Sequence, residues 1–147
     1  MPETILIDKI SDYSGHNAAI YGLSQISGDD HFYSVGGEGW IVKWPNTGSV
    51  MDGVLVGETG GKLFSIATVS ENDLLIAGDI HGDLFWIDTN NKEILGRSAF
   101  HKGSVFDIFV INPSQLVTVS GDGYICLWDI GQRLPLLSKR LSNQGLR

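Results

Sequence analysis

Short apolar runs, separated by turns that contain glycine, recur along the whole chain. In residues 33–46 (YSVGGEGWIVKWPN) and 117–130 (VTVSGDGYICLWDI), apolar residues alternate with other residues on each side of such a turn. This period of two is typical of a strand with one buried face, whereas no stretch of a dozen residues keeps a helical period. The chain has 19 glycines and only 4 prolines, which indicates many tight turns. The pattern therefore predicts an all-β fold.

One unit, a short strand, a turn that ends in glycine and a second strand, occurs three times. The three copies are 33–46, 76–89 (IAGDIHGDLFWIDT) and 117–130. Their turn glycines, Gly39, Gly82 and Gly123, are 43 and then 41 residues apart. This spacing is typical of β-propeller blades, which are small four-stranded antiparallel sheets. We place the repeats at residues 14–57, 58–99 and 100–140 of a single partial propeller that spans 1–147.

The register of the repeats follows from the turn glycines and not from the tryptophans. Trp44 and Trp128 are the fifth residues after their turn glycines, but Trp86 is the fourth and Ile87 takes the fifth place. A slip of one residue turns every side chain of a strand to the opposite face of the sheet. We therefore expect Ile87, and not Trp86, to occupy the position of Trp44 and Trp128.

The third repeat contains the most informative motif. His101 precedes it, the turn reads Gly121-Asp122-Gly123, and the second strand ends in Trp128-Asp129. With these residues the chain resembles the WD40 repeat β-propeller family. The resemblance implies a hydrogen-bonded tetrad that makes the blade rigid and has no catalytic role. By position its members would be His101, Ser120, Asp122 and Trp128.

The other two repeats depart from this motif. The first keeps Gly15-His16 and Trp44 but has Gly36 and Glu38 in the places of the serine and the aspartate. The resemblance therefore implies only a partial tetrad of His16 and Trp44 there. The second repeat retains none of the four residue types, since its corresponding residues are Thr59, Gly78, His81 and Ile87.

The number of strands predicts an incomplete ring. Residues 4–9 (TILIDK) read as an additional outer strand, which would belong to a preceding or swapped blade. Three blades and one spare strand do not close a propeller, and an open arc would expose the apolar face of each end blade. Two alternatives remain open: the chain is the N-terminal part of a longer propeller, or it is a half that associates with further copies.

The stretch GDIHGD, residues 78–83, raises a different possibility. Asp79 and His81, two residues apart after an apolar strand, resemble the first metal-binding motif of calcineurin-like metallophosphoesterases. A two-metal site needs several further carboxylate, amide and histidine ligands. The family's second Gly-Asp motif and its Gly-Asn-His motif do not occur here as a connected set. We therefore expect a β-turn, no metal and no cofactor, and keep the phosphoesterase as the alternative function.

Composition and charge narrow the class of partner. The net charge of −7 argues against nucleic acid, which basic surfaces bind by displacing counterions. The apolar runs are too short to span a membrane, and the first residues lack the features of a signal peptide. The single cysteine, Cys126, cannot form an internal disulfide. These features predict a cytoplasmic protein that binds neither nucleic acid nor membrane.

The resemblance to WD40 propellers implies a non-catalytic scaffold for protein–protein interaction. In that family, the turns between the second and third strands and the loops between blades form a face that binds proteins or peptides. Acidic residues on or near this face indicate a basic partner. The candidate contact residues are Asn17, Glu38, Trp40, Asp83, Lys102 and Tyr124.

Overall fold

The computed structural model describes residues 2–46 and 52–147, which form three four-stranded antiparallel sheets and no helix. The predicted all-β fold of three blades is thus confirmed. No helix long and apolar enough to cross a membrane occurs among these residues.

Blade 1 contains β1 (Ile20–Ser24), β2 (His31–Gly36), β3 (Trp40–Pro45) and β4 (Val54–Glu58). Blade 2 contains β5 (Leu63–Val69), β6 (Leu74–Asp79), β7 (Asp83–Asp88) and β8 (Glu93–Ala99). Blade 3 contains β9 (Val105–Asn112), β10 (Gln115–Ser120), β11 (Tyr124–Asp129) and β12 (Leu134–Arg140).

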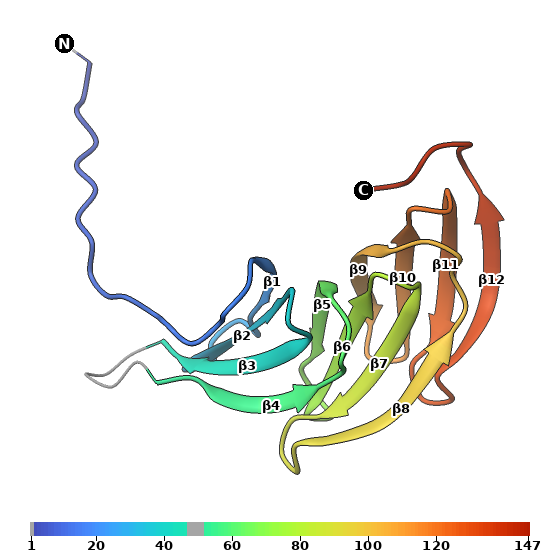
Figure 1. The fold of residues 1–147 in the computed structure, drawn as a ribbon, viewed down its shortest axis with the longest axis horizontal. Helices are drawn as coiled ribbons and strands as arrows, with labels where there is room; N and C mark the ends of the chain where they lie inside the picture. The colour runs from blue at the N-terminus through green and yellow to red at the C-terminus, as the bar shows by residue number, and fades with distance from the viewer. Residues whose placement is uncertain (1, 47–51) are drawn as a thin grey trace.

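The three blades are arranged as a fan (Figure 1). Their first strands, β1, β5 and β9, lie next to one another, whereas the outer strands β4 and β8 barely touch. Aromatic rings follow this inner edge, with ring centroids 4.7 Å apart for Tyr21 and Phe64 and 5.9 Å apart for Phe64 and Phe106. Since each ring comes from a different blade, the rings join the three sheets near the axis of the fan.

The strand pairing confirms the glycine register. The third residue after each turn glycine pairs with the fifth residue before it, which gives Ser34 with Val42, Ala77 with Phe85 and Thr118 with Cys126. Consequently Ile87 takes the place of Trp44 and Trp128, and Trp86 points to the other face of its sheet. The turn glycines require their residue type, because φ is +82°, +97° and +82° at Gly39, Gly82 and Gly123.

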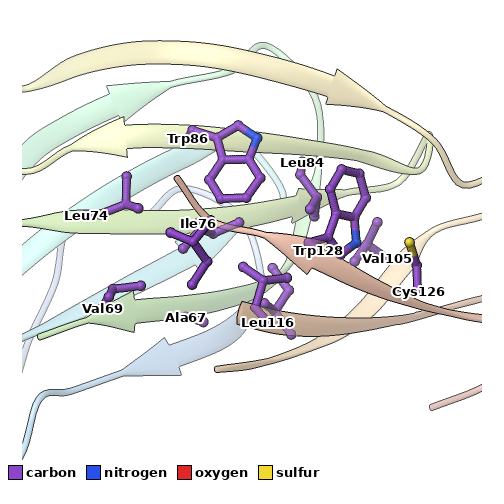
Figure 2. Packing of buried hydrophobic residues seen from close by; sticks show 12 residues of the cluster. Ala67, Val69, Leu74, Ile76, Leu84, Trp86, Val105, Leu116, Cys126 and Trp128 are labelled. Atoms are coloured by element: carbon purple, nitrogen blue, oxygen red, sulfur yellow. The ribbon is translucent and has the colours of Figure 1, made fainter. Parts of the chain in front are cut away.

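Two apolar cores lie between the sheets. The core between blades 2 and 3 is built around Trp86 and Trp128, whose ring centroids are 6.2 Å apart (Figure 2). The core between blades 1 and 2 has no such pair and includes Tyr33, Val35 and Ile87. Complete burial of a large apolar side chain contributes about 1.5–3 kcal/mol, so these cores are the main stabilising contacts between blades.

The N-terminal segment does not form the predicted strand within the chain. Residues 4–9 pair with none of the described strands, and Ile7 is 90% exposed. The segment runs away from blade 1 (Figure 1). A strand requires a hydrogen-bonding neighbour, and the described residues provide none at this place. Its pairing with a preceding or swapped blade stays a prediction. The chain then returns to blade 1 at Tyr13, which donates to the backbone oxygen of Pro45 at 2.9 Å and packs edge-on against Trp44.

The outward face of blade 3 is apolar and exposed. A row of paired residues crosses all four strands of this face: Phe109, Val117, Leu127 and Leu137. Phe109 is 67% exposed and Leu137 is 69% exposed. The corresponding row of blade 2 is Ala67, Ile76, Trp86 and Gly96, and its apolar side chains are buried against blade 3. Blade 3 thus carries the same kind of surface, and none of the sheets formed by residues 2–46 and 52–147 covers it.

Candidate protein-interaction face

The turns β2–β3, β6–β7 and β10–β11 and the loops between blades meet on one side of the fan. Backbone hydrogen bonds connect each turn to the segment that follows its sheet. Thr59 N donates to Gly39 O at 2.9 Å, His101 N to Gly82 O at 3.1 Å and Leu141 N to Gly123 O at 2.9 Å. This side is therefore one continuous surface, although it comes from three sheets.

A buried hydrogen-bond network fixes this surface in blade 3. The hydroxyl of Thr118 lies between His101 and Trp128, with Oγ1 2.7 Å from His101 Nε2 and 2.9 Å from Trp128 Nε1. The other ring nitrogen of His101, Nδ1, is 3.1 Å from Asp122 Oδ2. A neutral histidine fits these contacts, because Nδ1–H can donate to the carboxylate while Nε2 accepts from threonine. The network connects the inter-blade loop, β10, the turn and β11.

The prediction that Ser120 supplies the hydroxyl of this network is wrong. Ser120 Oγ donates instead to the backbone oxygen of Gly103 at 2.8 Å, next to the turn. Thr118 and Ser120 are two residues apart on one strand and so face the same side of the sheet. Only Thr118 lies at the level of His101 and Trp128. The sequence contains a signal for it, since Thr118 precedes Trp128 by ten residues and Ser34 precedes Trp44 by the same number.

Blade 1 has a complete network and not the partial one expected from His16 and Trp44 alone. Ser34 Oγ is 2.6 Å from His16 Nε2 and accepts from Trp44 Nε1 at 2.8 Å, so Ser34 and not Gly36 has the hydroxyl position. The carboxylate of Glu38 bonds to His16 Nδ1. Glu38 was also expected to contact a partner, and this is wrong because its side chain is only 14% exposed and is held by His16.

Blade 2 has no corresponding network, because Ala77 and Ile87 replace the hydroxyl residue and the tryptophan. Its GDIHGD turn is held by Asp79, whose Oδ1 accepts from the backbone amides of His81 and Asp83, each at 2.9 Å. Among the described residues, no three His, Cys, Asp or Glu side chains are placed to hold a metal. Asp79 thus acts as a turn residue, while the His81 side chain is exposed.

Asp83 does not belong to the accessible surface, contrary to prediction. It is only 4% exposed, and its Oδ2 accepts from Arg97 Nε at 2.7 Å and also from Arg97 Nη2. A carboxylate that accepts from two nitrogens of a guanidinium group already has a strong partner within the chain. The position of Asp83 next to the turn glycine correctly placed it on the side of the turns. The sequence alone did not show that Arg97 on β8 binds its carboxylate.

The other four predicted contact residues remain accessible. Asn17 and Lys102 are exposed in the inter-blade loops, and Tyr124 is 36% exposed at the start of β11. Trp40 is half-buried, with its Nε1 donating to Glu58 at 3.3 Å. The backbone of Lys102 is fixed, because its N–H donates to Asp122 Oδ2 at 2.9 Å. The face thus presents aromatic and polar side chains from a rigid backbone.

The charge state of the blade 3 network makes stability depend on pH. Burial lowers the pKa of His101, and the nearby Asp122 only partly opposes this effect. Burial alone would raise the pKa of Asp122, but the Lys102 and Tyr124 amides and His101 lower it overall. Below about pH 6.5, His101 binds a proton more readily in the unfolded chain than in the folded chain, so the stability of the fold decreases. Protonation of Asp122 lowers the stability further at lower pH.

We therefore expect the thermal unfolding midpoint to fall as the pH is lowered from 7 to 5. The measurement is calorimetry across this range for the wild-type chain and for His101→Gln, which keeps hydrogen-bonding groups but cannot titrate. The variant should show a smaller change with pH than the wild type. Identical pH profiles would contradict the assignment of the effect to His101.

Comparison with known proteins identifies the fold. No family model matches the sequence, and no curated protein does. Solved structures do match: the WD40 β-propeller domain of Doa1 has a TM-score of 0.79 and 19% identity over 90% of this chain. The WD40 repeats of RRP9 and the structure of U3-55K each have a TM-score of 0.79 and 17% identity over the same share. The three sheets therefore have the fold of WD40 β-propeller blades.

The similarity extends over only part of each solved structure. The chain covers 44% of the Doa1 chain and 42% of each of the other two. It is thus a partial propeller that spans less than half the length of these chains. The observation agrees with the uncovered apolar face of blade 3.

Proposed function

We propose that this chain is a non-catalytic module for protein–protein interaction that binds a protein or peptide on the face formed by its turns and inter-blade loops. The observation that carries the proposal is the pair of buried networks around Ser34 and Thr118. They fix the backbone of this face and leave the side chains of Trp40, Lys102 and Tyr124 accessible. A preorganised surface loses little conformational entropy on binding, and Trp and Tyr are frequent anchors of interfaces.

The charge of this face gives little support to a basic partner. Glu38 and Asp83 were two of the acidic residues behind that expectation, but His16 and Arg97 hold their carboxylates. Glu58 is exposed and accepts from Trp40 Nε1. With Lys102 also exposed, the face is mixed in charge. Recognition would therefore depend mainly on the aromatic side chains and on shape.

A comparison of two triple variants tests the interaction face. The first, Trp40→Ala/Lys102→Ala/Tyr124→Ala, truncates the accessible side chains. The matched control, Asn72→Ala/Ser114→Ala/Gln132→Ala, truncates exposed residues in the turns at the opposite ends of the strands. Proteins captured from cell extract by the wild-type chain are quantified by mass spectrometry. We expect the first variant to lose most specific partners, by about tenfold or more, and the control to keep them. Equal losses in both variants would refute this face as the binding surface.

The alternative function, a metal-dependent phosphoesterase at Asp79 and His81, has a direct assay. We expect the purified chain not to hydrolyse an aryl phosphate in the presence of Mn²⁺, because the Asp79 carboxylate is held by two backbone amides. Hydrolysis that is abolished by His81→Ala would show that the scaffold proposal is wrong. This assay separates the two functions without knowledge of a partner.

The uncovered face of blade 3 supports a further part of the proposal, namely that additional blades complete the propeller. They could come from a longer parent chain or from further copies of this chain. Light scattering coupled to size exclusion should show the isolated chain as an assembly larger than its 16.0 kDa monomer. Phe109→Asp/Leu137→Asp should restore the monomer, and Leu95→Asp, at an exposed position on β8, should not. A wild-type chain that is monomeric at high concentration would contradict self-association.

A further inference from the structure

A large hollow lies between blades 1 and 2, on the side opposite to the proposed interaction face. Its volume is about 790 Å³, and it is lined by the loops β1–β2, β5–β6 and β7–β8, by Asp52 and by strand residues. The equivalent place between blades 2 and 3 is filled by the pair of Trp86 and Trp128. By the confirmed register, Lys43 stands in the place of Trp86 and Ile87 in the place of Trp128. At both positions a smaller side chain thus replaces an indole ring, and Lys43 lines the hollow.

Apolar side chains form part of the wall of the hollow. Val56, Val69 and Leu74 line it and are buried, and Val54 adds to the same wall. Tyr33 also lines it and is only 4% exposed. Walls of this kind suit an aliphatic chain that enters from solvent, because contact with it removes apolar surface from water.

Charged groups also line the hollow. Four carboxylates contribute to the lining, and the only fully charged cations among its residues are Lys43 and Lys92. His31 also lines the hollow, with Nδ1 3.1 Å from Asp30 Oδ1 and Nε2 3.7 Å from Asp29 Oδ2. The lining is therefore net negative and favours a cation. The four carboxylates belong to Asp29, Asp30, Asp52 and Asp73.

Tyr33 lines the hollow together with Thr89, Asp29 and Asp73. Burial raises the pKa of Tyr33, the Thr89 side chain opposes this, and the charges of Asp29 and Asp73 raise the pKa further. The hydroxyl of Thr89 donates a hydrogen bond to the backbone oxygen of Asp73, at 2.9 Å. The oxygen of a tyrosine hydroxyl has lone pairs that can accept a hydrogen bond from a cationic group.

From these contacts we propose that the hollow binds the side chain of an arginine or lysine from a partner peptide. The cationic head lies near Asp29 and Asp73 and donates to the Tyr33 oxygen, while its aliphatic stem packs against Val56 and Val69. An arginine or lysine matches this lining because each has an apolar stem and a charged tip that only donates hydrogen bonds. This is a second binding site, separate from the turn-and-loop face, and its validity does not depend on that face.

Fluorescence anisotropy with a labelled Gly-Arg octapeptide tests the site, with a Gly-Glu octapeptide as the comparison probe. The wild-type chain should bind the arginine peptide and not the glutamate peptide. Asp29→Asn/Asp73→Asn should weaken binding about tenfold. Glu58→Gln/Asp107→Asn removes the same net charge from exposed positions outside the hollow and should leave affinity nearly unchanged. Equal weakening by both variants would mean that only bulk charge attracts the peptide, which would overturn the proposal.

Substitution of Lys43 distinguishes filling of the hollow from a change in its charge. Lys43→Trp restores the residue found at the equivalent position of blade 2 and should abolish binding, although it removes a repelling positive charge. Lys43→Met removes the same charge without filling the hollow and should strengthen binding about threefold. Circular dichroism and thermal unfolding check that both variants are folded. Undiminished binding by a folded Lys43→Trp, or no binding of the arginine peptide by the wild type, would overturn the proposal.

Discussion

Thr118→Val should lower the free energy of unfolding by about 3 kcal/mol. Valine has nearly the shape of threonine, so the substitution removes the hydroxyl and creates almost no cavity. Two buried groups then lose their partner: His101 Nε2, now 2.7 Å from Oγ1, and Trp128 Nε1, now 2.9 Å from it. A buried polar group without a partner costs about 1–3 kcal/mol, and here two are created at once. Urea unfolding followed by tryptophan fluorescence measures the loss.

Ser120→Ala is the matched control, since it removes a hydroxyl from the same strand and the same face. Ser120 Oγ donates to Gly103 O, so the variant loses one main hydrogen bond and should cost about 1 kcal/mol. A larger cost for Ser120→Ala than for Thr118→Val would mean that the network is built around Ser120, as the family motif alone suggested. The two variants therefore separate the structural assignment from the sequence-based one.

The fold was predictable because the repeat constrains many positions at once. Gly39, Gly82 and Gly123 mark turns with positive φ, where glycine is strongly favoured, and the alternation of apolar residues fixes which faces are buried. These two constraints together placed Ile87 correctly, even though Trp86 gives a more regular spacing of tryptophans. Both act on local geometry, which a single sequence reports directly.

The hydroxyls of the networks were less predictable, because alternation identifies a face and not a level along the strand. Thr118 and Ser120 lie on one face, and only the position of the neighbouring loop determines which of them meets His101. In blade 1 the same ambiguity concealed Ser34. Glu38 added a second difficulty, since a glutamate has one more methylene than aspartate and was interpreted as a surface residue, although it reaches His16.

Contacts between distant segments account for the other differences. Asp83 was expected to be accessible because it follows a turn glycine, but Arg97 from the neighbouring strand covers it. No local pattern predicts which long side chain will reach a given carboxylate. The hollow between blades 1 and 2 has the same origin, because residues from both sheets and from several loops line it. Such sites become visible only when the repeats are compared in their packed positions.

Gly82→Ala should lower the free energy of unfolding by about 4 kcal/mol or more, because it adds two separate costs. The residue has φ of +97°, a conformation that is strained for alanine. A Cβ atom at this position would also lie 2.1 Å from the backbone oxygen of His101 and 2.6 Å from its carbonyl carbon. The loop would have to move away, which would break the 3.1 Å bond from His101 N to Gly82 O and displace the His101 side chain from Thr118.

Gly60→Ala isolates the first of these costs. Gly60 also has positive φ, +77°, but a Cβ atom there would meet nothing within 4 Å. Its substitution should therefore cost only about 1–2 kcal/mol, from backbone strain alone. The difference between the two variants measures how strongly the close approach of loop and turn stabilises the blade. Equal losses of unfolding free energy in the two variants would show that the loop at His101 can move away from the turn at no energetic cost. This contact would then not contribute to the rigidity proposed for the interaction face.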